Sequence, residues 1–79
     1  MIDRAGARMN QPKLLDVVAL TRDLPDRRLV RGQVGTVVEQ LAADVLEVEF
    51  SDDDGRTYAT AAVPASHLLV LRYNPIEAA

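Results

Sequence analysis

The chain has 79 residues, a formal net charge of −3, one histidine and no cysteine. A chain of this length forms at most one domain. Without cysteine it has neither disulfides nor thiolate metal sites, and one histidine is too few for an ordinary zinc site. We therefore expect no metal and no cofactor, and the mild acidity disfavours non-specific binding to nucleic acid.

The two ends of the chain are expected to be tails around one folded body. Residues 1–12 mix glycine, proline, amide and charged residues without a period, and residues 74–79 include a proline that a continuing strand would not accept. The domain is therefore expected over residues 13–73. No segment reaches the roughly 18 apolar residues of a transmembrane helix, and the N-terminus lacks the apolar stretch of a secretory signal. We expect a cytoplasmic protein without membrane contact.

The first half of the domain predicts two strands separated by a long loop. Residues 14–21 (LLDVVALT) are rich in valine and leucine, which is typical of a strand. Residues 22–32 (RDLPDRRLVRG) hold a proline, charged residues and a closing glycine, a composition typical of loops. Residues 34–41 predict the second strand, in which Gly35 indicates a bulge, a bend or a close backbone approach. Three apolar residues are expected to pack the loop against the sheet: Leu24, Leu29 and Val30.

The second half predicts a hairpin, a short turn and a last strand. Residues 45–51 (VLEVEFS) alternate apolar and acidic side chains, which predicts a strand with one buried face made of Leu46, Val48 and Phe50. The Asp54-Gly55 pair then indicates a hairpin turn over residues 52–56, with both residues of the pair at positive φ. Three segments complete the domain: a returning strand at 57–63, a 3₁₀ turn at 64–67 and a strand at 68–73.

These segments predict an all-β domain of the small SH3-like barrel kind. It has about five antiparallel strands, a long loop after the first strand and one 3₁₀ turn before the last. Closure of a barrel leaves few exposed strand edges, which suits a domain of this size. The alternative is a helix over residues 34–46, where several residues favour helix, but Gly35 and the Val37-Val38 pair oppose it.

The same segments resemble a family of small bacterial proteins classed as a domain of unknown function (DUF4926). The resemblance rests on the runs LDVVALT, RGQVGTVVE, EVEF, DGRTYA and LLVL and on the LP pair and single leucine of the loop. In this chain those pieces occupy residues 15–21, 24–25, 29, 31–39, 47–50, 54–59 and 68–71. The resemblance implies an SH3-like barrel, and it implies no reaction because none is established for the family.

Residues 31–37 (RGQVGTV) are also similar to two shorter elements of other proteins. One is the glycine-bearing turn of KOW motifs in ribosomal proteins and transcription factors, and the other is the barrel of the nitrile hydratase β subunit. Two glycines at this spacing arise wherever a small barrel bends. These similarities therefore imply a fold and do not imply a function.

The sequence contains no arrangement typical of catalysis, so we do not expect an enzyme. Ser66 and His67 are adjacent, and no third group is evident that would complete a catalytic triad. Residues 52–55 (DDDG) resemble part of a calcium loop, but the alignment puts Phe50 and Ala61 at positions where the loop needs ligands. The sequence leaves only weak binding of magnesium or calcium as an alternative for this segment.

Segregated charge along the chain predicts a binding surface. Four of the nine basic residues fall within residues 22–31, and six of the twelve acidic residues fall within residues 44–54. Arginine is enriched at protein interfaces, whereas nucleic-acid readers of this kind also need stacking aromatics, and only Phe50, Tyr58 and Tyr73 are available. We expect a protein partner, contacted by the loop and the hairpin through Arg22, Leu24, Pro25, Arg27, Arg28, Arg31, Asp54, Arg56 and Tyr58. The alternative is that both segments are simply solvated.

Three functions follow in order of preference. The first is a non-enzymatic interaction or accessory module, of the antitoxin or immunity type, that binds a separately encoded protein. The second is a KOW-like nucleic-acid-binding protein that uses the same arginines to contact phosphates. The third is a non-catalytic subunit domain of a larger enzyme. A homodimer is compatible with each of them.

Overall fold

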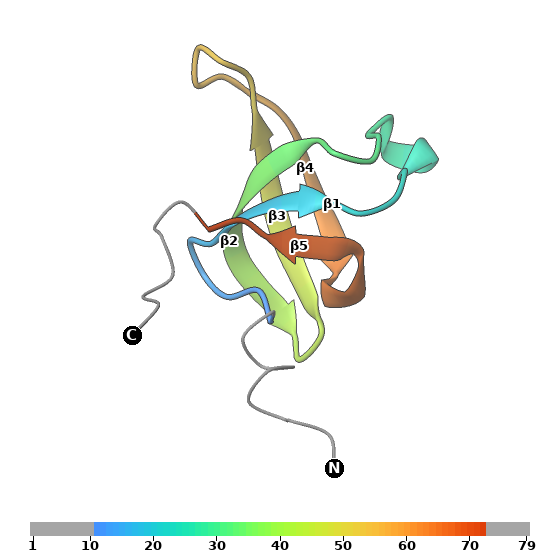
Figure 1. The fold of residues 1–79 in the computed structure, drawn as a ribbon, viewed down its shortest axis with the longest axis vertical. Coiled ribbons are helices and arrows are strands. Elements are labelled where there is room, and N and C mark those ends of the chain that lie inside the picture. The colour runs from blue at the N-terminus through green and yellow to red at the C-terminus, as the bar shows by residue number, and fades with distance from the viewer. Residues whose placement is uncertain (1–10, 73–79) are drawn as a thin grey trace.

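Five antiparallel strands form one sheet in the computed structural model, which describes residues 11–72 (Figure 1). The strand order across the sheet is β4-β3-β2-β1-β5. Two short 3₁₀ helices, η1 and η2, follow β1 and β4. In chain order the elements are β1 (Val17–Leu20), η1 (Pro25–Arg27), β2 (Val34–Ala42), β3 (Val45–Ser51), β4 (Thr57–Pro64), η2 (Ala65–His67) and β5 (Leu68–Val70).

The sheet curls around a single core to which every strand contributes. β3 contributes three fully buried side chains, since Leu46, Val48 and Phe50 have no exposed surface, as the alternation of the sequence predicts. Burying a valine, leucine or phenylalanine side chain stabilises a fold by about 1.5–3 kcal/mol. The other buried apolar residues come from the remaining strands and from the loop after β1: Val18, Leu20, Leu29, Val37, Ala61, Val63 and Leu68.

The fold class predicted from the sequence is confirmed. The described domain is all-β, with a long loop after β1 and the 3₁₀ turn η2 directly before β5, which is the arrangement expected of an SH3-like barrel (Figure 1). β4 buries Ala61 and Val63 on one face and exposes Thr60 and Ala62 on the other, so its short alanines allow close packing without breaking the alternation. The alternative helix over residues 34–46 is wrong, because that segment forms β2 and the start of β3.

The first and last strands are shorter than the sequence predicts. Leu14 and Leu15 lie in a turn, in which the backbone N–H of Asp16 donates to the carbonyl of Lys13 at 3.0 Å. Leu15 has a φ of 71°, a left-handed conformation that no extended strand accepts, so β1 begins only at Val17. β5 ends at Val70 instead of continuing to residue 73.

Most residues of the two predicted tails lie outside the part of the chain that the structure describes. Residues 1–10 and 73–79 lie outside the described residues; of the predicted N-terminal tail, Gln11 is exposed and Pro12 is buried. Within residues 11–72 there is no helix with the length and apolarity needed to cross a membrane.

The hairpin between β3 and β4 forms where it was predicted but with different turn geometry. Gly55 has a φ of 82°, whereas Asp54 is not at positive φ. The N–H of Gly55 donates to the carbonyl of Asp52 at 3.0 Å, and the N–H of Asp52 donates to the carbonyl of Arg56 at 2.9 Å. This is the three-residue loop in which a tight turn is followed by a left-handed glycine. The Asp52 carboxylate fixes it by accepting hydrogen bonds from the N–H groups of Asp54 and Arg56.

Gly35 marks a close approach between β2 and β3. A Cβ atom at this position would lie 2.6 Å from Cγ1 of Val48, 2.8 Å from the carbonyl oxygen of Glu49 and 3.0 Å from Cδ2 of Phe50. The bulges of β2 lie further along the strand, between Val37 and Glu39 and between Gln40 and Ala42. Of the three roles that the sequence left open for Gly35, close backbone approach is therefore the one observed.

Replacing Gly35 by alanine is expected to destabilise the domain by about 1–3 kcal/mol, because overfilled cores must shift backbone or side chains. Urea unfolding followed by circular dichroism measures this as a lower midpoint. Gly55→Asn is the control, since a Cβ atom at that position would meet nothing within 4 Å and asparagine tolerates positive φ. Equal midpoints for the two variants would contradict the close-approach interpretation.

Replacing Leu15 by asparagine is expected to stabilise the domain by about 0.5–1 kcal/mol, because asparagine accepts the left-handed conformation more readily than leucine does. Leu15 is 72% exposed, so its removal forfeits little packing. Leu14→Asn is the matched control, since Leu14 is 57% exposed and is not at positive φ. The explanation fails if thermal unfolding shows the same gain for both variants, or a loss for Leu15→Asn.

Candidate functional site

Residues 22–31, here called the arginine loop, leave the sheet after β1 and return at β2 (Figure 1). The loop folds back on itself through a two-residue bridge. The N–H of Leu24 donates to the carbonyl of Leu29 at 2.8 Å, and the N–H of Leu29 donates to the carbonyl of Leu24 at 3.1 Å. The short helix η1 lies between these two leucines and begins with Pro25, whose fixed φ favours that conformation. The tip of the loop is thus a closed, hydrogen-bonded unit.

Apolar contacts attach this unit to the core. Leu29 is 1% exposed and belongs to the core, and Leu24 packs against it while remaining partly exposed. Both were predicted to pack the loop against the sheet. Val30, predicted to do the same, is 55% exposed. Because Leu29 points inward, its neighbour in the extended chain points outward.

Hydrogen bonds also fix the base of the arginine loop. The N–H of Arg31 donates to a carboxylate oxygen of Asp23 at 2.8 Å, and this hydrogen bond joins the two ends of the loop. The N–H of Gly32 donates to the carbonyl of Leu20, and the N–H of Thr21 donates to the carbonyl of His67 in η2. The loop is therefore held at its tip, its base and its contact with η2.

The four arginine side chains of this fixed loop are exposed: Arg22, Arg27, Arg28 and Arg31. None of their guanidinium groups hydrogen-bonds or ion-pairs with another residue in the described part of the chain. Arg28 has a φ of 57°, a conformation that glycine or asparagine usually supplies and that costs other residues about 1–2 kcal/mol. Strained backbone of this kind is concentrated at binding and catalytic sites.

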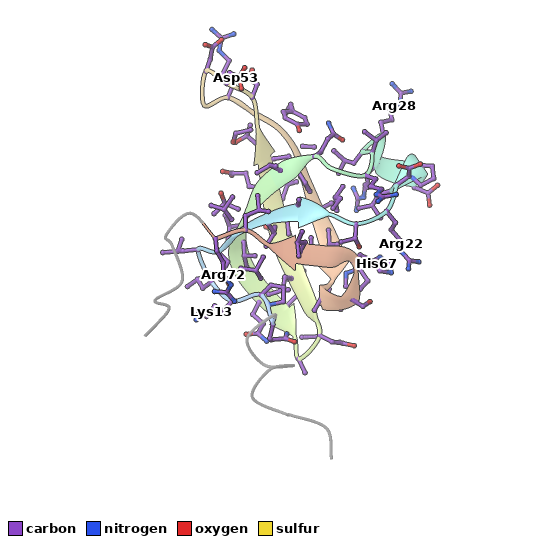
Figure 2. The ribbon with its side chains drawn as sticks, viewed as in Figure 1. Lys13, Arg22, Arg28, Asp53, His67 and Arg72 are labelled. Carbon is purple, nitrogen blue, oxygen red and sulfur yellow. The ribbon has the colours of Figure 1, made fainter. Side chains whose placement is uncertain are left out.

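The second candidate segment, residues 52–56, is here called the acidic hairpin. Asp53, Asp54 and Arg56 have exposed side chains, whereas the Asp52 carboxylate is occupied by the turn itself. Figure 2 shows Asp53 and Arg28 on two separate projections at the same end of the molecule. The structure therefore places Arg28 and Asp53 on separate projections of one end, whereas Arg22 lies beside His67 (Figure 2).

Gln33 connects the arginine loop to β4, beside the acidic hairpin. Its side-chain oxygen accepts from the N–H of Val30 at 2.6 Å, and its side-chain nitrogen donates to the hydroxyl of Tyr58 at 3.2 Å. The Tyr58 ring is 48% exposed, and its centroid lies 6.4 Å from that of the buried Phe50. The sequence did not single out Gln33, because an amide before a strand carries no signal until its partners are known.

Not every predicted contact residue lies at the surface of this end. Leu24 is partly buried and supports the loop from below, whereas Pro25 is exposed at the start of η1. Tyr58 is joined to the loop through Gln33. The predicted set thus divides into five exposed arginines, one exposed aspartate, one exposed proline, one exposed aromatic ring and one apolar anchor.

Titratable residues elsewhere in the described chain show no arrangement of a reactive centre. Ser66 is exposed, and His67 is partly buried with its Nδ1 atom enclosed and without a hydrogen-bond partner. Among residues 11–72, no three His, Asp or Glu side chains are grouped closely enough to hold a metal ion. We take the exposed end with the arginine loop and the acidic hairpin as the candidate site because of its exposed charged side chains on a hydrogen-bonded backbone.

Comparison with known proteins adds a family to this description. No curated protein and no solved structure matches the chain. The model of a family described as a domain of unknown function, DUF4926, matches residues 14–70, which include all five strands, the arginine loop and the acidic hairpin. The chain therefore belongs to the DUF4926 family, as the resemblance of its sequence segments predicted.

Proposed function

We propose that this domain is a non-enzymatic protein-interaction module whose arginine loop binds an acidic surface of a separately encoded protein. The single observation that carries this proposal is the combination of a fixed loop backbone with four exposed arginines that have no partner within the described residues. A solvated loop without a role needs no such fixation. An antitoxin or immunity role, in which the domain covers a surface of its partner, is one form of this interaction.

The fixed backbone favours binding because it lowers the entropy lost on association. A loop that is already held at its tip and base orders little further when a partner binds, and such preorganisation raises affinity. The left-handed conformation of Arg28 supports the same inference, since a position suited to glycine carries a long charged side chain. Arginine is among the residues most often found as binding hot spots.

A protein partner agrees with the exposed groups better than a nucleic acid does. Single-strand binding relies on aromatic platforms on which bases stack. Phe50 is buried and Tyr73 lies outside the described residues, so Tyr58 is the single exposed aromatic ring among residues 11–72. Guanidinium groups pair equally well with carboxylates, in forked geometry.

Neutralising the loop is expected to release the partner. With tagged protein and lysate of the source cell, the native chain should retain a near-stoichiometric protein after nuclease treatment. The variant R27Q/R28Q should bind that protein at least about tenfold more weakly, because hot-spot truncations commonly cost more than 1 kcal/mol.

The variant K13E is the matched control for this experiment. Both variants lower the formal net charge by two, from −3 to −5, but Lys13 lies away from the arginine loop (Figure 2). Capture that survives in R27Q/R28Q, or that is lost equally in K13E, would contradict the proposal. Recovery of a large catalytic chain would identify the module as a subunit domain of an enzyme.

Titration with fluorescent single-stranded RNA and DNA separates the KOW-like function from the proposed one. We expect no binding near physiological salt. If the four arginines contacted phosphates, the logarithm of the binding constant would fall with the logarithm of salt concentration with a slope of about −3. Binding with such a slope, lost in R27Q/R28Q, would replace the protein-interaction proposal by a nucleic-acid one.

A further inference from the structure

The arginine loop and the acidic hairpin have opposite charges but do not neutralise each other within the molecule. Arg27 and Arg28 form no ion pair with a described residue, and the same holds for the side chains of Asp53 and Asp54. The two projections lie at one end of the barrel, separated across it (Figure 2). Each leaves a charged surface that a complementary molecule could cover.

Exposed apolar groups accompany these two charged projections. Tyr58 is 48% exposed and Val30 is 55% exposed. Gln33 joins these two residues, since its side chain hydrogen-bonds to the N–H of Val30 and to the hydroxyl of Tyr58. An apolar, aromatic centre with a charged rim is the usual composition of a protein interface.

We propose that a second copy of this chain binds this end of the molecule, in a two-fold symmetric dimer. In such a contact the same patch is used by both copies, so a loop that meets the partner's hairpin implies a hairpin that meets the partner's loop. Charge complementarity is then satisfied twice, between the arginines of one copy and Asp53 and Asp54 of the other. The inference goes beyond the proposed function and needs no separately encoded protein.

The consequence for the proposed function is competition. A dimer formed in this way covers Arg27 and Arg28, the same residues that are proposed to bind the acidic partner. The dimer is therefore a resting form, and an acidic partner binds by displacing the second copy. Because exposed ion pairs are weak and screened by salt, the dimer dissociates readily and more so at high ionic strength.

Sedimentation velocity over a range of protein concentrations at low salt tests the dimer. The native chain should show a concentration-dependent dimer. The variants R27E/R28E and D53K/D54K should each dimerise at least about tenfold more weakly, because like charges then face each other across the contact. An equimolar mixture of the two should regain a dimer, since every charged contact in the mixed pair is again between opposite charges.

The mixture needs a control for net charge. D53K/D54K and E39K/D44K both raise the formal charge from −3 to +1, but Asp44 lies in the β2–β3 turn, at the opposite end of the barrel from the acidic hairpin (Figure 1). R27E/R28E mixed with E39K/D44K should add no dimer beyond that which E39K/D44K forms with itself, because one charged contact of the mixed pair is between like charges. All substituted side chains are exposed, and far-UV circular dichroism verifies folding.

Three outcomes would overturn the proposal: a native chain that is monomeric throughout, a dimer that both charge reversals leave unchanged, or a charge-reversed pair that fails to associate when mixed. Should a reversed variant unfold, R27Q/R28Q and D53N/D54N must each weaken the native dimer by about threefold or more. A monomeric native chain that still loses its lysate partner in R27Q/R28Q would refute the dimer alone. A dimer without any lysate partner would refute the proposed function alone.

Discussion

The close approach of β2 to β3 at Gly35 is the constraint on which the rest of the domain depends. Only a residue without a Cβ atom fits there, above Val48 and Phe50 and against the backbone of Glu49. Gly35 also pairs with Val18 of β1 and with Phe50 of β3, so the contact lies between the two strands that bring Val18, Leu20 and Phe50 to the core. A chain this short has little other surface to bury, so a close contact within its core matters for its stability.

The same core determines the position of the candidate site. Leu29 is part of the core although it belongs to no strand, and through its bridge to Leu24 it fixes the tip of the arginine loop. The arginine loop is thus attached to the core by Leu29 and to its surroundings by hydrogen bonds at its base. A small domain can in this way hold a long loop in place through one buried side chain and its backbone.

The sequence predicted what depends on local patterns and missed what depends on contacts. Alternation in β3 predicted the inward positions of Leu46, Val48 and Phe50, because period two is a property of the strand itself. The left-handed conformation of Leu15 could not be predicted, since leucine rarely adopts it. It accompanies a hydrogen bond from the N–H of Leu15 to the carbonyl of Val37, a contact that the local sequence does not reveal. The clustering of charge located both segments of the candidate site. Their link through Gln33 could not be predicted, because it joins residues 25 positions apart.

The two bulges of β2 have a consequence for the insertions and deletions that the domain can accept during evolution. Pairing with β3 shifts register twice between Val37 and Ala42, and every residue from Val38 to Ala42 is exposed. In a regular strand, one inserted residue would reverse the inward and outward faces of everything beyond it. Here the bulges lie in the C-terminal half of β2, where every side chain is exposed and none belongs to the core. Related chains can therefore differ in length in this segment while the core and the candidate site keep their places.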